Sequence, residues 1–96
     1  MNWDNTISDF RSYLRLERSM SENTINSYLS DLKKLEVFLS GRDGGAVPDS
    51  DAITSEDLSQ FLENQQTLGI SKRSQARMVS AMRTFYKFLE LEGVVK

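Results

Sequence analysis

Basic and hydroxyl side chains recur at helical spacing between residues 71 and 93. On a helix at about 100° per residue, one narrow stripe holds Arg73, Arg77, Ser80, Thr84 and Lys87. Guanidinium groups, hydroxyls and the free N–H groups of a helix start are donors that bind phosphates and base edges. No acidic residue interrupts the stripe, whereas a solvated helix face usually mixes both signs. The stripe is therefore either a binding surface for an anionic partner or the polar outside of a bundle helix.

A second polar cluster, SENTINS, occupies residues 21–27. Short hydrogen-bonding side chains concentrate at helix starts, where one or two of them cap free N–H groups. Asn26 and Ser27 lie beyond the first turn and are mediocre helix formers, so they are either incidental or contacts for a partner. In the major groove of DNA, arginine suits guanine and asparagine suits adenine. If the helices that begin near residues 21 and 71 cross with their starts together, the two clusters form one recognition surface.

The residues that catalysis usually requires are largely missing. The chain has neither His nor Cys, which excludes a His-based general base, a disulfide and a thiolate or imidazole zinc site within it. Serines are plentiful, but none has an evident activating base. Asp49 and Asp51 lie in a Gly-rich segment without calcium-loop spacing. We therefore expect a binding module without metal or cofactor, and a free-standing enzyme is the weakest alternative.

Four helical patterns and no strand pattern predict an all-α, compact four-helix bundle in one domain, residues 1–96. The helices are expected at about residues 6–18, 22–39, 55–68 and 72–92, with a flexible loop at 40–53. The first helix should be capped by Asn5 or Thr6, with Trp3 packing just upstream of it.

Apolar residues at helical spacing define the predicted core. In the second helix they are Ile25, Tyr28, Leu32, Leu35 and Leu39. The third helix contributes Leu58, Phe61, Leu62 and Leu68, and the fourth contributes Met78, Val79, Met82, Phe85, Tyr86 and Leu89. End signals are Ser21 before the second helix, Thr54 with Asp57 as a capping box, Gly69 after the third helix, and Ser71 and Gly93 around the fourth.

The charge distribution is strongly polarised, although the net charge is only −2. Residues 43–71 hold six acids and no base, whereas residues 72–96 hold six bases and two acids. A local basic face matters more for binding than the total, because each charge reaches only about 10 Å at 0.1 M salt. No apolar run approaches the roughly 18 residues of a membrane span, and the first residues are acidic, so we expect a cytoplasmic location without a membrane partner.

Three segments resemble a known family. They are FRSYLRLERSMSENTINSYLSDL from Phe10, ITSEDL from Ile53, and GISKRSQARMVSAMRTFYKFL from Gly69. Together they are similar to the N-terminal core-binding domain of tyrosine recombinases of the Xer type, within the phage integrase family. The resemblance covers nearly the whole chain except the Gly-rich loop.

The resemblance implies an orthogonal SAM-like bundle that forms half of a clamp around duplex DNA. It implies that the second and fourth helices face the major groove, with DNA contacts from Asn23, Thr24, Asn26, Ser27, Lys72, Arg73, Ser74, Arg77 and Ser80. Tyr28 and Asp31 match positions that fix the second helix, and Arg83 matches the motif at the edge of the stripe.

The parent protein would cut and rejoin DNA through a phosphotyrosine, using catalytic residues of a C-terminal domain. Its partners would be a double-stranded recombination site and other recombinase protomers, while this domain alone would be monomeric and would not cut. Both chromosome dimer resolution and mobile-element integration fit this resemblance. The alternative is a helical protein-interaction module whose basic face docks an acidic partner.

Overall fold

Four α-helices and one short 3-10 turn make up the computed structural model, which describes residues 2–42, 44–45 and 49–93. The elements are α1 (Trp3–Leu16), α2 (Glu22–Arg42), the turn η1 (Ser50–Ala52), α3 (Ser55–Thr67) and α4 (Lys72–Leu91). The all-α bundle expected from the sequence is confirmed, and the described part of the chain contains no strand. None of the described helices combines the length and hydrophobicity needed to cross a membrane.

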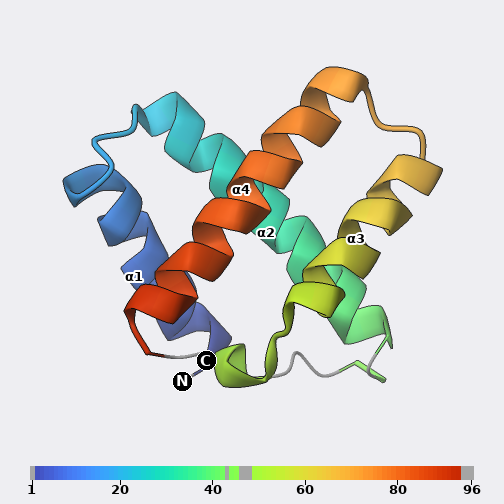
Figure 1. Ribbon diagram of the computed structural model, residues 1–96, viewed down its shortest axis with the longest axis horizontal. Helices are drawn as coiled ribbons and strands as arrows, with labels where there is room; N and C mark the ends of the chain where they lie inside the picture. The colour runs from blue at the N-terminus through green and yellow to red at the C-terminus, as the bar shows by residue number, and fades with distance from the viewer. Residues whose placement is uncertain (1, 43, 46–48, 94–96) are drawn as a thin grey trace.

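The helices α2 and α4 cross as an X at the centre of the molecule, with α1 and α3 on either side (Figure 1). Each flanking helix packs against both members of the crossed pair. The core lies where these four surfaces meet, because each helix turns its apolar stripe inward.

Aromatic rings bind α1 to α4. Phe10 packs edge-on against Phe85 with ring centroids 5.2 Å apart, and it contacts Phe88 at 5.3 Å. Trp3 adds a second edge-on contact with Phe85 at 5.9 Å. Such pairs stabilise a core by about 0.5–1.5 kcal/mol each beyond the area that they bury.

The first helix begins three residues earlier than the sequence predicts, which is a correction. Asn2, not Asn5 or Thr6, is the cap, and its side chain accepts a hydrogen bond from the Asn5 backbone N–H at 2.8 Å. Trp3 therefore lies inside the helix. Thr6 is buried, and its hydroxyl shares a 2.6 Å hydrogen bond with Ser50. Packing of Trp3 and Thr6 against distant partners extends the helix, and local sequence cannot reveal such contacts.

The expected loop at 40–53 is shorter in the structure, because α2 continues to Arg42. This last residue donates to Asp57 of α3 at 2.8 Å, an interaction across 15 residues that holds the final turn of α2. At the other end of the segment, Ser50 and Ile53 are buried against the core. Positions 43 and 46–48 of the expected loop lie outside the described residues.

The predicted core is correct for all five positions in α2 and wrong at Leu68. This side chain is 68% exposed because α3 ends at Thr67, and Leu68 is already its C-cap. Gly69 follows with φ +82°, the left-handed conformation that stops a helix. In α4, Ala81 and Phe88 belong to the core although the pattern omitted them, while Val79 and Tyr86 are only half-buried.

The capping box at the start of α3 is confirmed. Thr54 Oγ1 accepts from the Asp57 backbone N–H at 3.1 Å, and Asp57 Oδ2 accepts from the Thr54 backbone N–H at 2.9 Å. Burial acts to raise the pKa of Asp57, but hydrogen bonds from Thr54 and Arg42 outweigh it and lower the pKa below its usual 3.8.

The lowered pKa of Asp57 predicts a specific pH dependence. Its charged form contributes stability that is fully present above pH 3.8 and is lost as the pH falls through the lower folded-state pKa. Asp57→Asn should therefore lower the free energy of unfolding by about 0.5–1 kcal/mol at neutral pH, and the difference should shrink toward about pH 2.5. Urea unfolding of both proteins at the two pH values measures this, and a difference independent of pH would contradict it.

Candidate nucleic-acid interface

The first turns of α2 and α4 lie on the same edge of the molecule, the upper edge in Figure 1. Above their crossing point the two helices diverge toward opposite ends of that edge. The first turns of α2 and α4 thus form the two arms of a V. The sequence-derived condition that the two starts come together is met in part: they share an edge but do not touch. Both starts direct free backbone N–H groups toward it, and such groups favour anions.

Both helix starts are capped in the same way. The Ser21 hydroxyl accepts from the Thr24 backbone N–H at 3.2 Å and donates to the Thr24 hydroxyl at 3.0 Å. In α4, Ser71 makes the equivalent bonds with Ser74, both at 3.1 Å. Thr24 and Ser74, two expected DNA contacts, therefore belong first to the caps. Each hydroxyl still has its own hydrogen to donate outward.

A forked ion pair lies at the crossing of the two helices. Arg77 donates from Nε to Oδ2 of Asp31 at 2.9 Å and from Nη2 to Oδ1 at 2.7 Å. The Asp31 side chain is 0% exposed, whereas that of Arg77 is 37% exposed. Hydrogen bonding to Asp31 raises the pKa of Arg77, so the guanidinium is charged at every accessible pH. The pair connects a buried carboxylate of α2 to a partly exposed cation of α4.

This pair limits the contacts that Arg77, an expected DNA contact, could make with a nucleic acid. Asp31 occupies the Nε/Nη2 side of the guanidinium, one of the two edges with which an arginine can form paired hydrogen bonds to guanine. Both hydrogens of Nη1 and one of Nη2 have no partner among the described residues, and they can contact a phosphate oxygen or a base. The sequence identified Arg77 and Asp31 separately but not as partners. The available signal was that Asp31 is an acid within the apolar seam of α2, four residues before Leu35.

The other expected contacts lie on the two arms of the V. Ser27 donates its hydroxyl hydrogen to the Asn23 carbonyl at 3.0 Å, so it offers an outside ligand only acceptor capacity. Exposed side chains without a hydrogen bond or ion pair in the described residues are Asn23, Asn26, Lys72, Arg73 and Ser80. The lower part of the stripe is separate: Thr84 is half-buried, and Lys87 borders a groove between α3 and α4.

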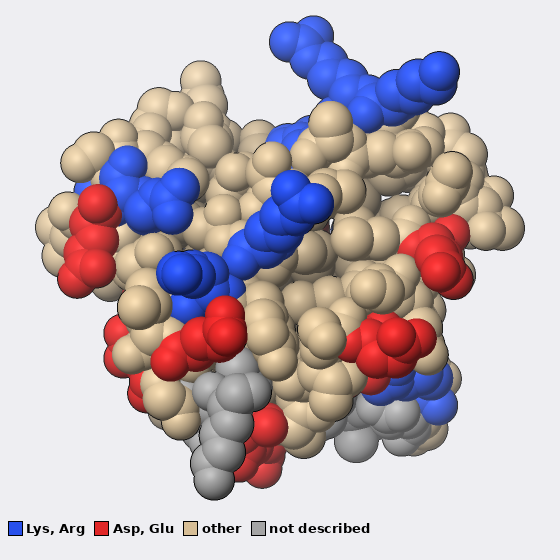
Figure 2. Space-filling view, viewed as in Figure 1, with Lys and Arg blue, Asp and Glu red and all other residues tan. Residues whose placement is uncertain are grey.

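Basic side chains project from the edge over the start of α4, and no acidic side chain lies beside them (Figure 2). On this face the acidic side chains lie lower down and on the flanks. The start of α4 thus carries a local concentration of positive charge in spite of the acidic total of the domain.

Comparison with known proteins identifies the fold. Residues 7–93 match the family described as "Phage integrase, N-terminal SAM-like domain". The chain belongs to this family. The resemblance expected from the sequence is therefore confirmed.

Curated relatives are tyrosine recombinases. XerC of Lacticaseibacillus casei is 33% identical over 90 residues, which cover 94% of this chain and 30% of the relative. XerD of Chlorobaculum tepidum is 38% identical over 90 residues, with 94% and 28% covered, and XerD of Agrobacterium fabrum is 38% identical over 88 residues, with 92% and 25% covered. The chain thus spans less than a third of the length of these relatives. No solved structure gives a significant match.

Asp31 and Arg77 differ in exposure, so removal of one or the other side chain should lower the stability of the domain by different amounts. Arg77→Ala leaves a fully buried carboxylate without a partner, and we expect it to lower the free energy of unfolding by roughly 3–5 kcal/mol. Asp31→Ala should cost less, because the partly exposed Arg77 can be hydrated in its place. Chemical denaturation measures both values.

A double variant separates charge from packing. Asp31→Leu combined with Arg77→Met replaces the pair by apolar groups, and it should recover most of the stability lost in Arg77→Ala. Equal losses in the two alanine variants, or a double variant as unstable as Arg77→Ala, would contradict this account of the pair.

Proposed function

We propose that this chain binds duplex DNA as the N-terminal clamp domain of a site-specific tyrosine recombinase. The V formed by α2 and α4 is the binding edge, with contacts from Asn23, Thr24, Asn26, Ser27, Lys72, Arg73, Ser74, Arg77 and Ser80. The observation that carries the proposal is that both helix starts share one edge, held by the Asp31–Arg77 pair, in a chain of the integrase family.

The proposed contacts fall into two kinds, those to phosphates and those to bases. Lys72 and Arg73, exposed at the start of α4, neutralise phosphates and position the domain. On the other arm, Asn23 and Asn26 offer amide groups that can read adenine. Arg77 contributes one phosphate contact through Nη1 while it remains bound to Asp31.

Recombination itself belongs to the rest of the polypeptide in this proposal. The domain holds the recombination site and contributes to an assembly of several protomers, while a C-terminal domain supplies the tyrosine that forms the phosphotyrosine link. The names of the curated relatives support this division, since the chain matches less than a third of their length.

Salt dependence tests the proposed phosphate contacts. If two or three phosphates are neutralised, the logarithm of the association constant should fall with the logarithm of salt concentration with a slope of about −2 to −3. Fluorescence anisotropy with a short labelled duplex measures this. A response that is flat in salt would favour the alternative of an acidic protein partner.

Substitution at Arg73 tests the position of the edge. Arg73→Ala should weaken binding uniformly across sequences and reduce the magnitude of the salt slope by about one. The matched control is Lys33→Ala, since Lys33 already pairs with Glu36 at 2.9 Å on the side of the domain near α1. Equal effects of the two substitutions would remove the start of α4 from the interface.

The proposal also predicts what the isolated domain does not do. Incubation with supercoiled DNA or with a nicked suicide substrate should give neither strand cleavage nor a covalent protein–DNA adduct on a denaturing gel. An adduct formed by this chain alone would show that Tyr13, Tyr28 or Tyr86 acts as a nucleophile, contrary to the proposal.

A further inference from the structure

The apolar face of α4 is wider than the part of it that is buried in the core. Val79 and Tyr86 stay half-buried at one border of that face, on the side of α3. Neither is needed to close the core, since the neighbouring Met78, Met82 and Phe85 are buried. The border of the apolar face is therefore left open between α3 and α4.

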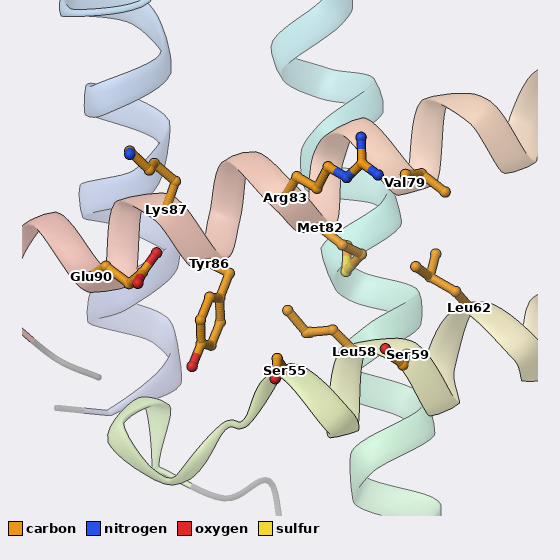
Figure 3. A pocket seen from close by; sticks show the side chains of 10 residues that line it. All are labelled: Ser55, Leu58, Ser59, Leu62, Val79, Met82, Arg83, Tyr86, Lys87 and Glu90. Atoms are coloured by element: carbon orange, nitrogen blue, oxygen red, sulfur yellow. The ribbon is translucent and has the colours of Figure 1, made fainter. Parts of the chain in front are cut away.

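This border forms one wall of a groove with a volume of about 400 Å³. Its apolar floor is made by Leu58 and Leu62 of α3 and by Val79, Met82 and Tyr86 of α4. In Figure 3, Leu58 points toward Met82 and Tyr86 across the gap, and the ring of Tyr86 extends toward Ser55.

The groove has the shape of a seat for a helix. On both walls the lining residues recur every three or four positions, as they do in the seam of a helical bundle. From Val79 to Glu90 the α4 wall runs for about 16 Å at 1.5 Å per residue, which is the length of three helical turns. No third helix of the described chain covers this seam.

The α4 side of the groove carries two cations. Arg83 and Lys87 of α4 are exposed along it and have no ion pair among the described residues, while Glu90 lies at its far end. Opposite them, α3 contributes only the hydroxyls of Ser55 and Ser59. Cations along the α4 side of an apolar floor, in an acidic domain, complement a ligand with apolar anchors and carboxylates on one side of them.

We propose that this groove binds an amphipathic helix of a partner protein, with apolar residues in the floor and acidic residues against Arg83 and Lys87. A duplex would place phosphates on the rim but nothing in the apolar floor. The site is distinct from the V, because its residues come from α3 and from the later turns of α4. It does not depend on the proposed DNA binding.

Two synthetic peptides test the proposal. Each is a helix of roughly three turns with leucines at positions i, i+3, i+4 and i+7, flanked by glutamates in one peptide and by lysines in the other. The glutamate peptide should bind the domain about tenfold more tightly at low salt. The double variant Arg83→Glu with Lys87→Glu should invert this order.

Matched variants separate the floor from the rim. Val79→Ser should weaken both peptides by roughly three- to tenfold, whereas Val37→Ser, at an exposed valine of α2, should change nothing. Arg18→Glu, in the turn between α1 and α2, is the control for charge reversal at the rim. Circular dichroism establishes that every variant is folded.

Four outcomes would overturn the proposal. The first is that neither peptide binds the folded domain, and the second is that binding is unaffected by Val79→Ser and by charge reversal. The third is self-association of the domain that Val79→Ser abolishes. The fourth is perturbation of the groove residues by duplex DNA. The third outcome would assign the groove to a second copy of the chain, and the fourth would assign it to nucleic acid.

Discussion

The position of α2 relative to α4 depends on the ion pair between Asp31 and Arg77. These residues are 46 positions apart in sequence, and the two bonds between them hold the helices at their crossing point. The hydrophobic effect is non-directional, whereas a forked ion pair has one geometry. Displacement of either helix would leave a fully buried carboxylate without its partner, at a cost of several kcal/mol. The ion pair thus adds one directional contact to the apolar packing that orients both helix starts.

This constraint explains why Arg77, on the candidate DNA-binding surface, uses part of its guanidinium to bind another residue of the domain. Arg77 fixes the frame with the forked side of its guanidinium and leaves Nη1 to the outside. The exposed side chains of Lys72 and Arg73 lie on the same edge, where they have no partner among the described residues. The same helix borders the groove with its later turns, so that α4 carries the core, the V and the groove on different parts of its surface.

Local signals in the sequence predicted most of the fold. Some features depend only on residues that are close together in sequence, and all of these are found in the structure. They are the apolar seam of α2, the capping box of Thr54 and Asp57, and the end residues Ser71 and Gly93 of α4. Errors arose where distant contacts decide the outcome. Trp3 is drawn into α1 by Phe85, and Arg42 is held in α2 by Asp57. Periodicity placed Arg77 on a polar stripe, but only the fold shows that a buried acid of another helix is its partner. The roles of the nine expected contacts remain predictions, because they depend on a ligand that the sequence of one chain does not contain.

The proposed DNA-binding edge of the domain is the V formed by α2 and α4. Titration of the isotopically labelled domain with a short duplex at low salt, followed by amide chemical shifts, tests it most directly, since non-specific phosphate binding suffices for the measurement. The largest shifts should fall in the first two turns of α2 and α4, around Asn23, Asn26, Lys72 and Arg73, and they should reverse when salt is added. Shifts confined to the groove between α3 and α4, or a spectrum unchanged by DNA, would contradict the proposal.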